Sequence, residues 1–295
     1  MSEPRPLFDS ALLASRRNRA AGRAADHDFL LRRVADDLTE RLAIVKRDFP
    51  VALDLGSHHG VLGRQIGASP NVGRLISLDP SARLLAQAPA PRVQGALEAL
   101  PFAPASFDLV ISGLSLQLVD DLPGTLFQIR HVLKPDGLLL AAVLGGQTLK
   151  ELREAWLLAE DDLLGGASPR VAPFADVRDL GGLLQRAGFA LPVADSDTVA
   201  VTYADPLALM RDIKGMGASN MLLDRRRVPA TRRLLMRAAE IYVERFGLAG
   251  GRVPATFEIL TLTAWAPHES QPKPLKPGSA QARLADALGV PERKA

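Results

Sequence analysis

A short stretch of the sequence, DLGSHHG from Asp54 to Gly60, has the residue types of a cofactor-binding loop. It continues the apolar run VALDL, which is typical of a buried strand, and its glycines allow a ligand to approach the backbone closely. In an open α/β sheet, ligands bind at this first turn after a strand. A second acidic residue, Asp79, ends the next apolar run, where its carboxylate can accept hydrogen bonds from both hydroxyl groups of a ribose. We therefore expect a nucleoside cofactor here.

The spacing of the glycines narrows the type of cofactor. A dinucleotide-binding loop needs the pattern G-x-G-x-x-G, whereas Gly56 and Gly60 lie four residues apart and follow an acidic residue. This arrangement resembles the D-x-G-x-G-x-G loop of the class I S-adenosylmethionine-dependent methyltransferases. The sequence has three further marks of that superfamily: LPF at 100–102, FDLV at 107–110 and LKPDG at 133–137. The resemblance implies a Rossmann-like, seven-stranded α/β fold and S-adenosylmethionine as the cofactor.

A narrower resemblance covers almost the whole chain, from Leu7 to about Ala280. The sequence is similar to the mitochondrial complex I assembly factors of methyltransferase fold, the arginine hydroxylases, in five stretches: GGQTLKELREAWLLAE, LGGLLQRAGF, LMRDIKGMGASN, VPATFEI and HESQPKPLKPGSA. Similarity to the malonyl-acyl-carrier-protein methyltransferases of biotin synthesis is confined to the core. The narrower resemblance implies a protein substrate, an arginine of a respiratory complex I subunit, that is modified during assembly of that complex.

The resemblance also implies which residues bind the cofactor, whereas no catalytic residue stands out. The loop would shape the pocket for the methionine end, and Asp79 would hold the ribose. Ala96 and Leu97 would flank the adenine, and Ser112 would line the floor after the fourth strand. The predicted cofactor-binding residues are Asp54, Gly56, Ser57, Gly60, Asp79, Pro80, Ala96, Leu97 and Ser112.

Four positions depart from the family pattern. His58 stands where the loop usually has its middle glycine, so that an imidazole could crowd the methionine end. Ala96 stands where an acidic residue usually accepts a hydrogen bond from the adenine amine, and losing such a bond costs about 1–3 kcal/mol. Gln117 replaces a histidine, and Gln147 replaces an acidic residue. The departures predict reduced affinity for the cofactor.

Other kinds of site find little support in the sequence. Adjacent residues such as His58 and His59 rarely converge on one metal ion, and there is no H-x-D or H-x-x-x-H spacing. The chain has no cysteine, which excludes thiolate nucleophiles and cysteine-bound metals. We therefore predict no metal site. Two alternatives to arginine modification stay open: methylation of a small or carrier-bound carboxylate, and a non-catalytic assembly chaperone that keeps the fold.

The elements that position the loop are predicted by alternating apolar runs. Short apolar runs bounded by turn residues alternate with helix-length segments, which predicts βαβ units around a buried parallel sheet. We expect strands at 51–56, 74–79, 92–96, 107–113, 137–145, near 198–203 and at 255–265. Helices are expected at 26–49, 176–189, from 206 onward and at 230–246.

Five regions follow from this pattern. The helices between the last two strands, together with the N-terminal helix, are expected to form a cap over the carboxyl edge of the sheet, where ligands of such folds bind. The predicted regions are an N-terminal helical segment (1–48), a methyltransferase-like core (49–204), a helical insertion (205–250), the last core strand (251–268) and a flexible tail (269–295).

Charge and composition exclude several classes of protein. The 295 residues include 36 basic and 33 acidic side chains, and the resulting net charge of +3 is too balanced to predict nucleic-acid binding. The arginines of RRNRAAGR, at 16–23, are expected on a solvated helix face. No apolar run is long enough to span a bilayer, and the N-terminus lacks the apolar core of a signal peptide. We expect a cytoplasmic protein, with peripheral contact to a membrane left open.

Overall fold

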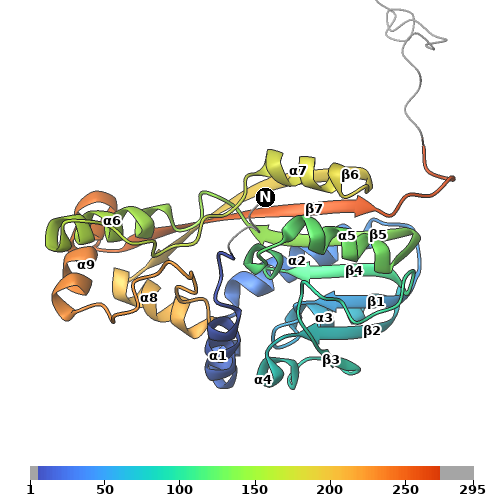
Figure 1. Ribbon diagram of the computed structural model, residues 1–295, viewed down its shortest axis with the longest axis horizontal. Helices are drawn as coiled ribbons and strands as arrows, with labels where there is room; N and C mark the ends of the chain where they lie inside the picture. The colour runs from blue at the N-terminus through green and yellow to red at the C-terminus, as the bar shows by residue number, and fades with distance from the viewer. Residues whose placement is uncertain (1–5, 273–295) are drawn as a thin grey trace, which may run out of the picture.

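The computed structural model describes residues 6–272, which form a seven-stranded sheet flanked by helices (Figure 1). The strands are β1 (Phe49–Leu55), β2 (Val72–Asp79), β3 (Arg92–Gln94), β4 (Phe107–Gly113), β5 (Leu133–Leu144), β6 (Ala190–Tyr203) and β7 (Val253–Trp265). Their order is β3-β2-β1-β4-β5-β7-β6. The neighbouring pairs from β3 to β5 are parallel, whereas β7 runs antiparallel to both β5 and β6. The predicted seven-stranded α/β fold is confirmed.

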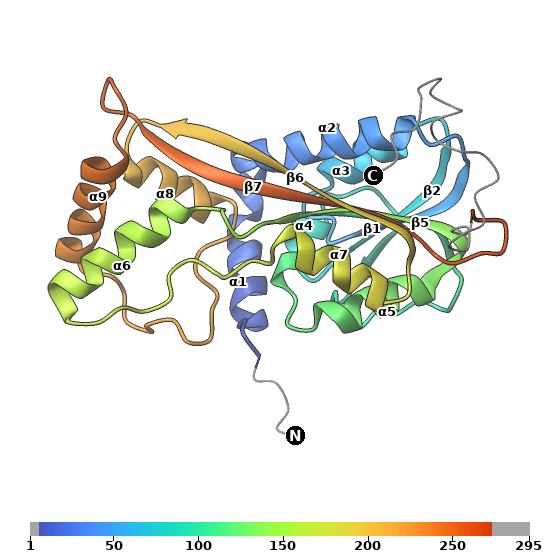
Figure 2. The same ribbon diagram turned by 90° about the horizontal axis from the view of Figure 1, so that it is seen from above.

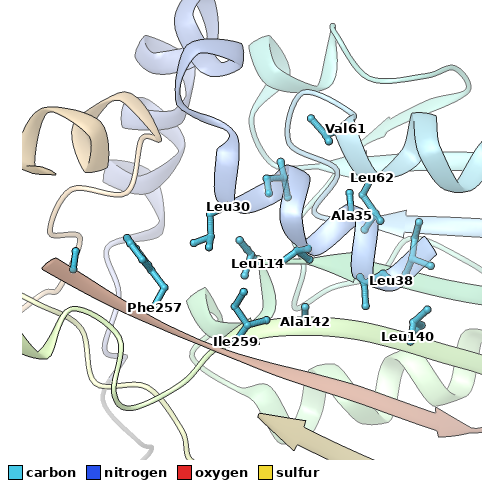
Figure 3. Close-up of a cluster of buried hydrophobic side chains, with 14 of the residues drawn as sticks. Leu30, Ala35, Leu38, Val61, Leu62, Leu114, Leu140, Ala142, Phe257 and Ile259 are labelled. Atoms are coloured by element: carbon cyan, nitrogen blue, oxygen red, sulfur yellow. The ribbon is translucent and has the colours of Figure 1, made fainter. Parts of the chain in front are cut away.

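Helices cover both faces of the sheet, because each has an apolar stripe that must be buried. The helices α2 (Phe29–Ala43) and α3 (Val61–Gly67) pack on one face, and α5 (Leu122–Val132) and α7 (Val177–Arg186) pack on the other (Figure 2). Figure 3 shows part of the first face, where apolar side chains of α2 and α3 meet those of β5 and β7. The two buried layers hold the carboxyl ends of the strands in place.

The far ends of β6 and β7 extend beyond the other strands and carry a second group of helices (Figure 2). These helices are α6 (Lys150–Leu164), α8 (Pro206–Gly215) and α9 (Arg232–Phe246). In α9, Tyr242 is fully buried and its hydroxyl donates to the carbonyl oxygen of Pro254 over 2.6 Å, which ties the helix to β7. The predicted insertion, 205–250, holds α8 and α9, and the division of the chain into regions stays a prediction.

The N-terminal helix α1 (Ser10–Ala20) and the 3-10 helix η1 (Ala21–His27) lie between the helical group and the strand ends (Figure 2). They contact the short helix α4 (Ala82–Leu85), which follows β2, and η1 also contacts α8. The segment before α1 is joined to residues between α8 and α9 by a bridge from Phe8 to Leu222. The N-terminal segment therefore closes the carboxyl edge of the sheet from the outside.

Several boundaries differ from the predicted ones. The helix expected at 26–49 ends at Ala43, because Phe49 already pairs with Val72 in the sheet. The strand expected near 198 begins at Ala190, directly after the turn at Gly188, and the strand expected from 137 begins at Leu133. Of the predicted tail, residues 273–295 lie outside the described part of the chain. Within residues 6–272, no helix is long and apolar enough to cross a membrane.

Candidate functional site

The loop between β1 and α3 has a tight backbone that depends on its glycines. Gly56 and Gly60 have positive φ angles of 75° and 85°, a conformation that suits glycine. A Cβ atom at Gly60 would lie 2.6 Å from the backbone of Ala88, so a larger residue does not fit without a shift. His58 also has a positive φ, 51°, a region in which histidine is enriched among non-glycine residues. The position where the family loop has a glycine thus keeps a left-handed backbone.

The side chain of His58 ties the loop to the end of β4. Its Nε2 lies 3.1 Å from the carbonyl oxygen of Gly113 and 2.9 Å from Ser115 Oγ. Because a carbonyl oxygen only accepts, Nε2 carries a proton and donates it to Gly113. Burial, with the charge of Arg17 nearby, holds the pKa of His58 well below its usual range, so the ring is neutral. The imidazole therefore occupies the space between the loop and β4 as an uncharged group.

Asp79, the predicted ribose ligand, is fully buried at the end of β2. Its Oδ1 accepts from the backbone N–H of Ser81 over 2.7 Å, and its Oδ2 accepts from the backbone N–H of His58 over 3.0 Å. Arg17 Nη1 lies 3.6 Å from Oδ2. Burial raises the pKa of Asp79, whereas the charge of Arg17 and the two N–H donors oppose that rise. Each carboxylate oxygen has lone pairs left for a further donor.

Arg17 reaches Asp79 from α1 and is itself buried, with 3% of its surface exposed. No described residue accepts a hydrogen bond from its Nη1. Helix α1 is fixed over the end of β2 because Asn18 Oδ1 accepts from Ser81 Oγ over 2.7 Å. The expectation that the run at 16–23 is a solvated face is therefore wrong for Arg17, whereas Arg19 and Arg23 are exposed.

Asp54, at the end of β1, is directed away from the cavity. It is fully buried, and its carboxyl group lies beneath the first turn of α3, against the backbone of Gly63. Burial raises the pKa of Asp54 to about 8, and the negative charge of Asp79 contributes to the rise. At neutral pH this side chain is therefore mostly an uncharged acid.

The remaining predicted residues surround the same loop. Ser112 Oγ donates to the carbonyl oxygen of Leu55 over 2.7 Å, which joins the ends of β4 and β1. Ser57 is buried, and its Oγ has no hydrogen-bond partner among the described residues. Leu97 is buried with its side chain toward Gly56. Outside this group, Pro80 is half-buried and Ala96 is exposed.

A cavity of ≈ 180 Å³ lies on the outer side of the loop, between the strand ends and the helices that cover them. Its apolar wall includes Leu30, Leu114 and Phe257, which are labelled in Figure 3. The loop itself contributes His58 and His59 to the lining. None of the nine predicted residues, all of which lie in the described part of the chain, lines this cavity. Their contact with a ligand stays a prediction.

The opposite side of the cavity has polar residues that sequence reasoning missed. Arg17, His27 and Asp28 line it from α1, η1 and the start of α2. Asp28 Oδ2 lies 3.0 Å from His59 Nε2, which joins this side to the loop. The only local signal was the polar run at 26–28 before an apolar helix. Across residues 6–272, no three acidic or histidine side chains are grouped to hold a metal ion.

Comparisons with known proteins agree with the observed fold. Residues 53–141 match a family model described as a methyltransferase domain. The chain is 42% identical over 268 residues to the mitochondrial arginine-hydroxylase NDUFAF5 of Danio rerio, covering 89% of this chain and 83% of that protein. It is 38% identical to the Homo sapiens protein of the same name, with 95% and 83% covered.

A second group of relatives carries a different activity. The chain is 35% identical over 276 residues to a malonyl-[acyl-carrier protein] O-methyltransferase of Methylovorus, covering 89% of this chain and 90% of that protein. Among solved structures, the YcgJ protein of Bacillus subtilis superposes with a TM-score of 0.55 at 16% identity, covering 79% of this chain and 99% of that one. At this identity the likeness indicates a shared fold. The similarity to acyl-carrier-protein methyltransferases extends beyond the core to which the sequence analysis confined it.

Proposed function

Because the chain belongs to the methyltransferase family that includes the arginine-hydroxylase NDUFAF5, we propose that it binds S-adenosylmethionine and modifies an arginine of a protein substrate. The expected substrate is a subunit of respiratory complex I during its assembly. Cytoplasmic action, with peripheral contact to the membrane, is part of the proposal. The observation that carries it is the buried pair Asp79 and Arg17 at the carboxyl end of β2, beside an apolar cavity.

The residues around the loop suit this cofactor. A ribose diol donates two hydrogen bonds, and Asp79 has acceptor capacity left on both oxygens. The cofactor's methionine end carries a carboxylate, and the unpartnered Nη1 of Arg17 is a buried donor of opposite charge. Gly56 and Ser57 would lie beside the methionine end, and Leu97 would pack against the adenine. Bound S-adenosylmethionine would supply an electrophilic sulfonium group.

The protein's own contribution is orientation and exclusion of water. Helix α1 covers the end of β2 through Asn18 and Arg17, so the ribose-binding position is shielded from solvent. The wall formed by Leu30, Leu114 and Phe257 keeps the neighbouring space apolar, which strengthens hydrogen bonds and charge interactions there. Positioning of reactants in such a site lowers a barrier without a conspicuous acid or base.

A second candidate function is methylation of a carboxylate. The observation that favours it is the charge of the cavity lining, because Arg17 and Arg170 both reach it. Arg170 is paired with Glu160 and stacks on Trp156. Arg17 faces Asp79 over 3.6 Å, but its Nη1 makes no hydrogen bond among the described residues and could donate one to an anionic substrate or to the cofactor's carboxylate. A non-catalytic assembly chaperone is the third alternative. It is suggested by the imidazole of His58 beside β4, which could crowd the methionine end of the cofactor.

Calorimetric titration with S-adenosylmethionine and S-adenosylhomocysteine tests whether the protein binds the proposed cofactor. We expect micromolar binding by the wild-type protein and a loss of at least about 100-fold, close to 2.7 kcal/mol, in Asp79→Ala. Asp79→Asn, which keeps the size of the side chain, serves if Asp79→Ala fails to fold. Asp197→Ala, on the exposed part of β6, is the matched control. No heat up to millimolar ligand would contradict the cofactor proposal.

Mass spectrometry of complex I subunits from a deletion strain tests whether the protein modifies an arginine of such a subunit. We expect one arginine-containing peptide to lose its added mass in the deletion strain and regain it on complementation with the wild-type gene. A gene carrying Asp79→Asn should not restore the mass. Unchanged arginine peptides would contradict the proposal, and methyl transfer to malonyl-acyl-carrier protein in vitro would favour the second candidate.

A further inference from the structure

Three residues from three different elements form a hydrogen-bonded chain at the edge of the cavity. His27 Nδ1, at the end of η1, lies 2.6 Å from Asp212 Oδ1 in α8. The hydroxyl of Tyr203, at the end of β6, donates to Asp212 Oδ2 over 2.8 Å. Both carboxylate oxygens of Asp212 are therefore engaged, each by a different element of the fold. None of these residues belongs to the predicted cofactor-binding set.

The chain of bonds fixes which nitrogen of His27 carries the proton. Burial and the adjacent Asp212 raise the pKa of Tyr203, so its hydroxyl keeps its proton and acts as a donor. A carboxylate accepts hydrogen bonds and cannot donate one, so His27 must donate from Nδ1. A neutral imidazole protonated at Nδ1 has its lone pair on Nε2. Asp212 and Tyr203 thus orient the ring and set its tautomer.

The second ring nitrogen of His27, Nε2, is without a hydrogen-bond partner in the described part of the chain. The exposed fraction of the side chain is 16%. His27 lines both the inner cavity and an open groove on the outside of α1 and α8. The ring packs directly on Gly215, where a Cβ atom would collide with it, so α8 has the one residue type that leaves room for the imidazole.

We infer that His27, oriented by Asp212 and Tyr203, is a proton acceptor that meets an N–H or O–H group of the substrate inside the cavity. The inference deepens the proposed function and rests on it for the reaction, because it names the group that would receive a proton from a substrate side chain such as a guanidinium. One proton passes from the substrate to Nε2 and then to water in the outer groove. Asp212 and Tyr203 are positioning residues.

The charge of the outer groove supports this direction of proton transfer. Two acidic residues line the groove with His27: Asp212, which is already engaged, and Asp26, which is paired with Arg23. The basic side chains in the same lining are more numerous: Arg16, Arg19, Arg23, Arg211 and Lys214. Like charges disfavour the charged form of a cationic group, so these side chains favour the passage of the proton from the imidazolium of His27 to water. The released proton reaches solvent directly, because the groove is open.

The tautomer is measurable without cofactor or substrate. In protein labelled with 15N-histidine, two-bond 1H–15N correlation spectra distinguish the two neutral tautomers, and His27→Gln assigns the signals. We expect the Nδ1–H form for His27 in the wild-type protein. In Asp212→Asn that preference should be lost, because the amide can donate to Nδ1. Asp162→Asn, in an exposed ion pair of α6, should change nothing.

Reaction with diethyl pyrocarbonate, mapped by mass spectrometry, gives a second readout. An unpartnered Nε2 lone pair on this partly exposed ring should be carbethoxylated at His27, with the reaction slowed on the order of tenfold in Asp212→Asn and less in Tyr203→Phe. If Asp212→Asn does not melt cooperatively, Tyr203→Phe decides. An Nε2–H tautomer in the wild-type protein, or an unreactive His27, would overturn the inference. Failure of cofactor binding by calorimetry would overturn the proposed function alone, since neither readout uses a cofactor.

Discussion

The two walls of the cavity differ in how their polar groups are used. The inner wall consists of the loop 54–60 with the ends of β1, β2 and β4, and of the loop only His58 and His59 line the cavity. Some of its side chains are bound by its own backbone, as His58 is by Gly113 and Asp79 by Ser81, whereas the oxygens of Asp54 and Ser57 Oγ have no hydrogen-bond partner among the described residues and are enclosed away from the cavity. The outer wall, formed by α1, η1 and α8, carries groups with free hydrogen-bonding capacity. Among the described residues, Arg17 Nη1 and His27 Nε2 have no hydrogen-bond partner.

This difference indicates where a ligand would find its partners. A buried donor without a partner costs about 1–3 kcal/mol, so such a group persists in a fold only when something else requires it. The inner wall has the sequence motif, supports the shape of the site and keeps the acceptor capacity of Asp79. The outer wall, which has no recognised motif, offers the donor and acceptor that a ligand could still engage.

Removing Arg17, the cation that links the two walls, should change the free energy of unfolding most. We expect Arg17→Met to lower the free energy of unfolding by about 3 kcal/mol, because it leaves Asp79 buried opposite an apolar chain. Urea unfolding at pH 7 measures the change. Arg19→Met, on the exposed side of the same helix, is the control and should stay within about 0.5 kcal/mol of the wild-type protein.

A double variant tests whether the loss comes from the pair itself. Arg17→Met combined with Asp79→Asn removes both charges, and we expect it to recover part of the stability that Arg17→Met loses. If Arg17→Met were as stable as Arg19→Met, then α1 would not be anchored on the inner wall, and the contrast between the walls would fail.

Replacing Asp54, the buried acid of the inner wall, should have a smaller effect on the free energy of unfolding, and this effect should depend on pH. Folded Asp54 keeps its proton up to about pH 8, whereas an unfolded aspartate loses it near pH 4. Between these values the folded state binds more protons, so the free energy of unfolding falls as pH rises, by at most about 1.4 kcal/mol per pH unit. Asp54→Asn has no such proton to lose, and its stability should fall less.

Urea midpoints measured from pH 5 to pH 8 check this prediction. We expect the curves of wild-type protein and Asp54→Asn to diverge toward pH 8, with the variant the more stable there. Asp197→Asn, exposed on β6, is the control and should follow the wild-type curve. Parallel curves for wild-type protein and Asp54→Asn would show that Asp54 is already ionised in the fold.

The same contrast explains which parts of the structure could be predicted from the sequence. The strand at 107–113 was predicted to the residue, and the start of α8 was marked by the cap Asp205 and the proline after it. These signals are local, because a few neighbouring residues determine them. The end of the helix before β1 was missed, since nothing in the sequence between Ala43 and Phe49 breaks a helix strongly.

A cap of helices over the carboxyl edge of the sheet was expected, but the side-chain contacts of the outer wall could not be predicted, because they join distant residues. His27 and Asp212 are 185 positions apart, and they meet only because α8 packs against η1. The half-buried ring of Tyr203 packs against the core, and its hydroxyl reaches Asp212. Sequence reasoning identified the loop and its neighbours Asp79 and Ser112 through the family motif. It missed Arg17 and Asp28, which tertiary packing brings to the same loop from outside the motif.

Replacing His58 should have the smallest effect on stability. This histidine of the loop lines the cavity, whereas the predicted residues do not. His58→Gly removes the imidazole and relaxes a positive φ of 51°, while it loses two ring hydrogen bonds, so we expect a net change in stability within about 1 kcal/mol. His58→Ala opens the same space but keeps a Cβ atom at that φ, and it should be about 1 kcal/mol less stable than His58→Gly. If the imidazole crowds the methionine end, both variants should bind S-adenosylmethionine more tightly than the wild-type protein in calorimetric titration. Equal or weaker binding by both variants would mean that His58 does not crowd the cofactor. The imidazole would then support cofactor binding.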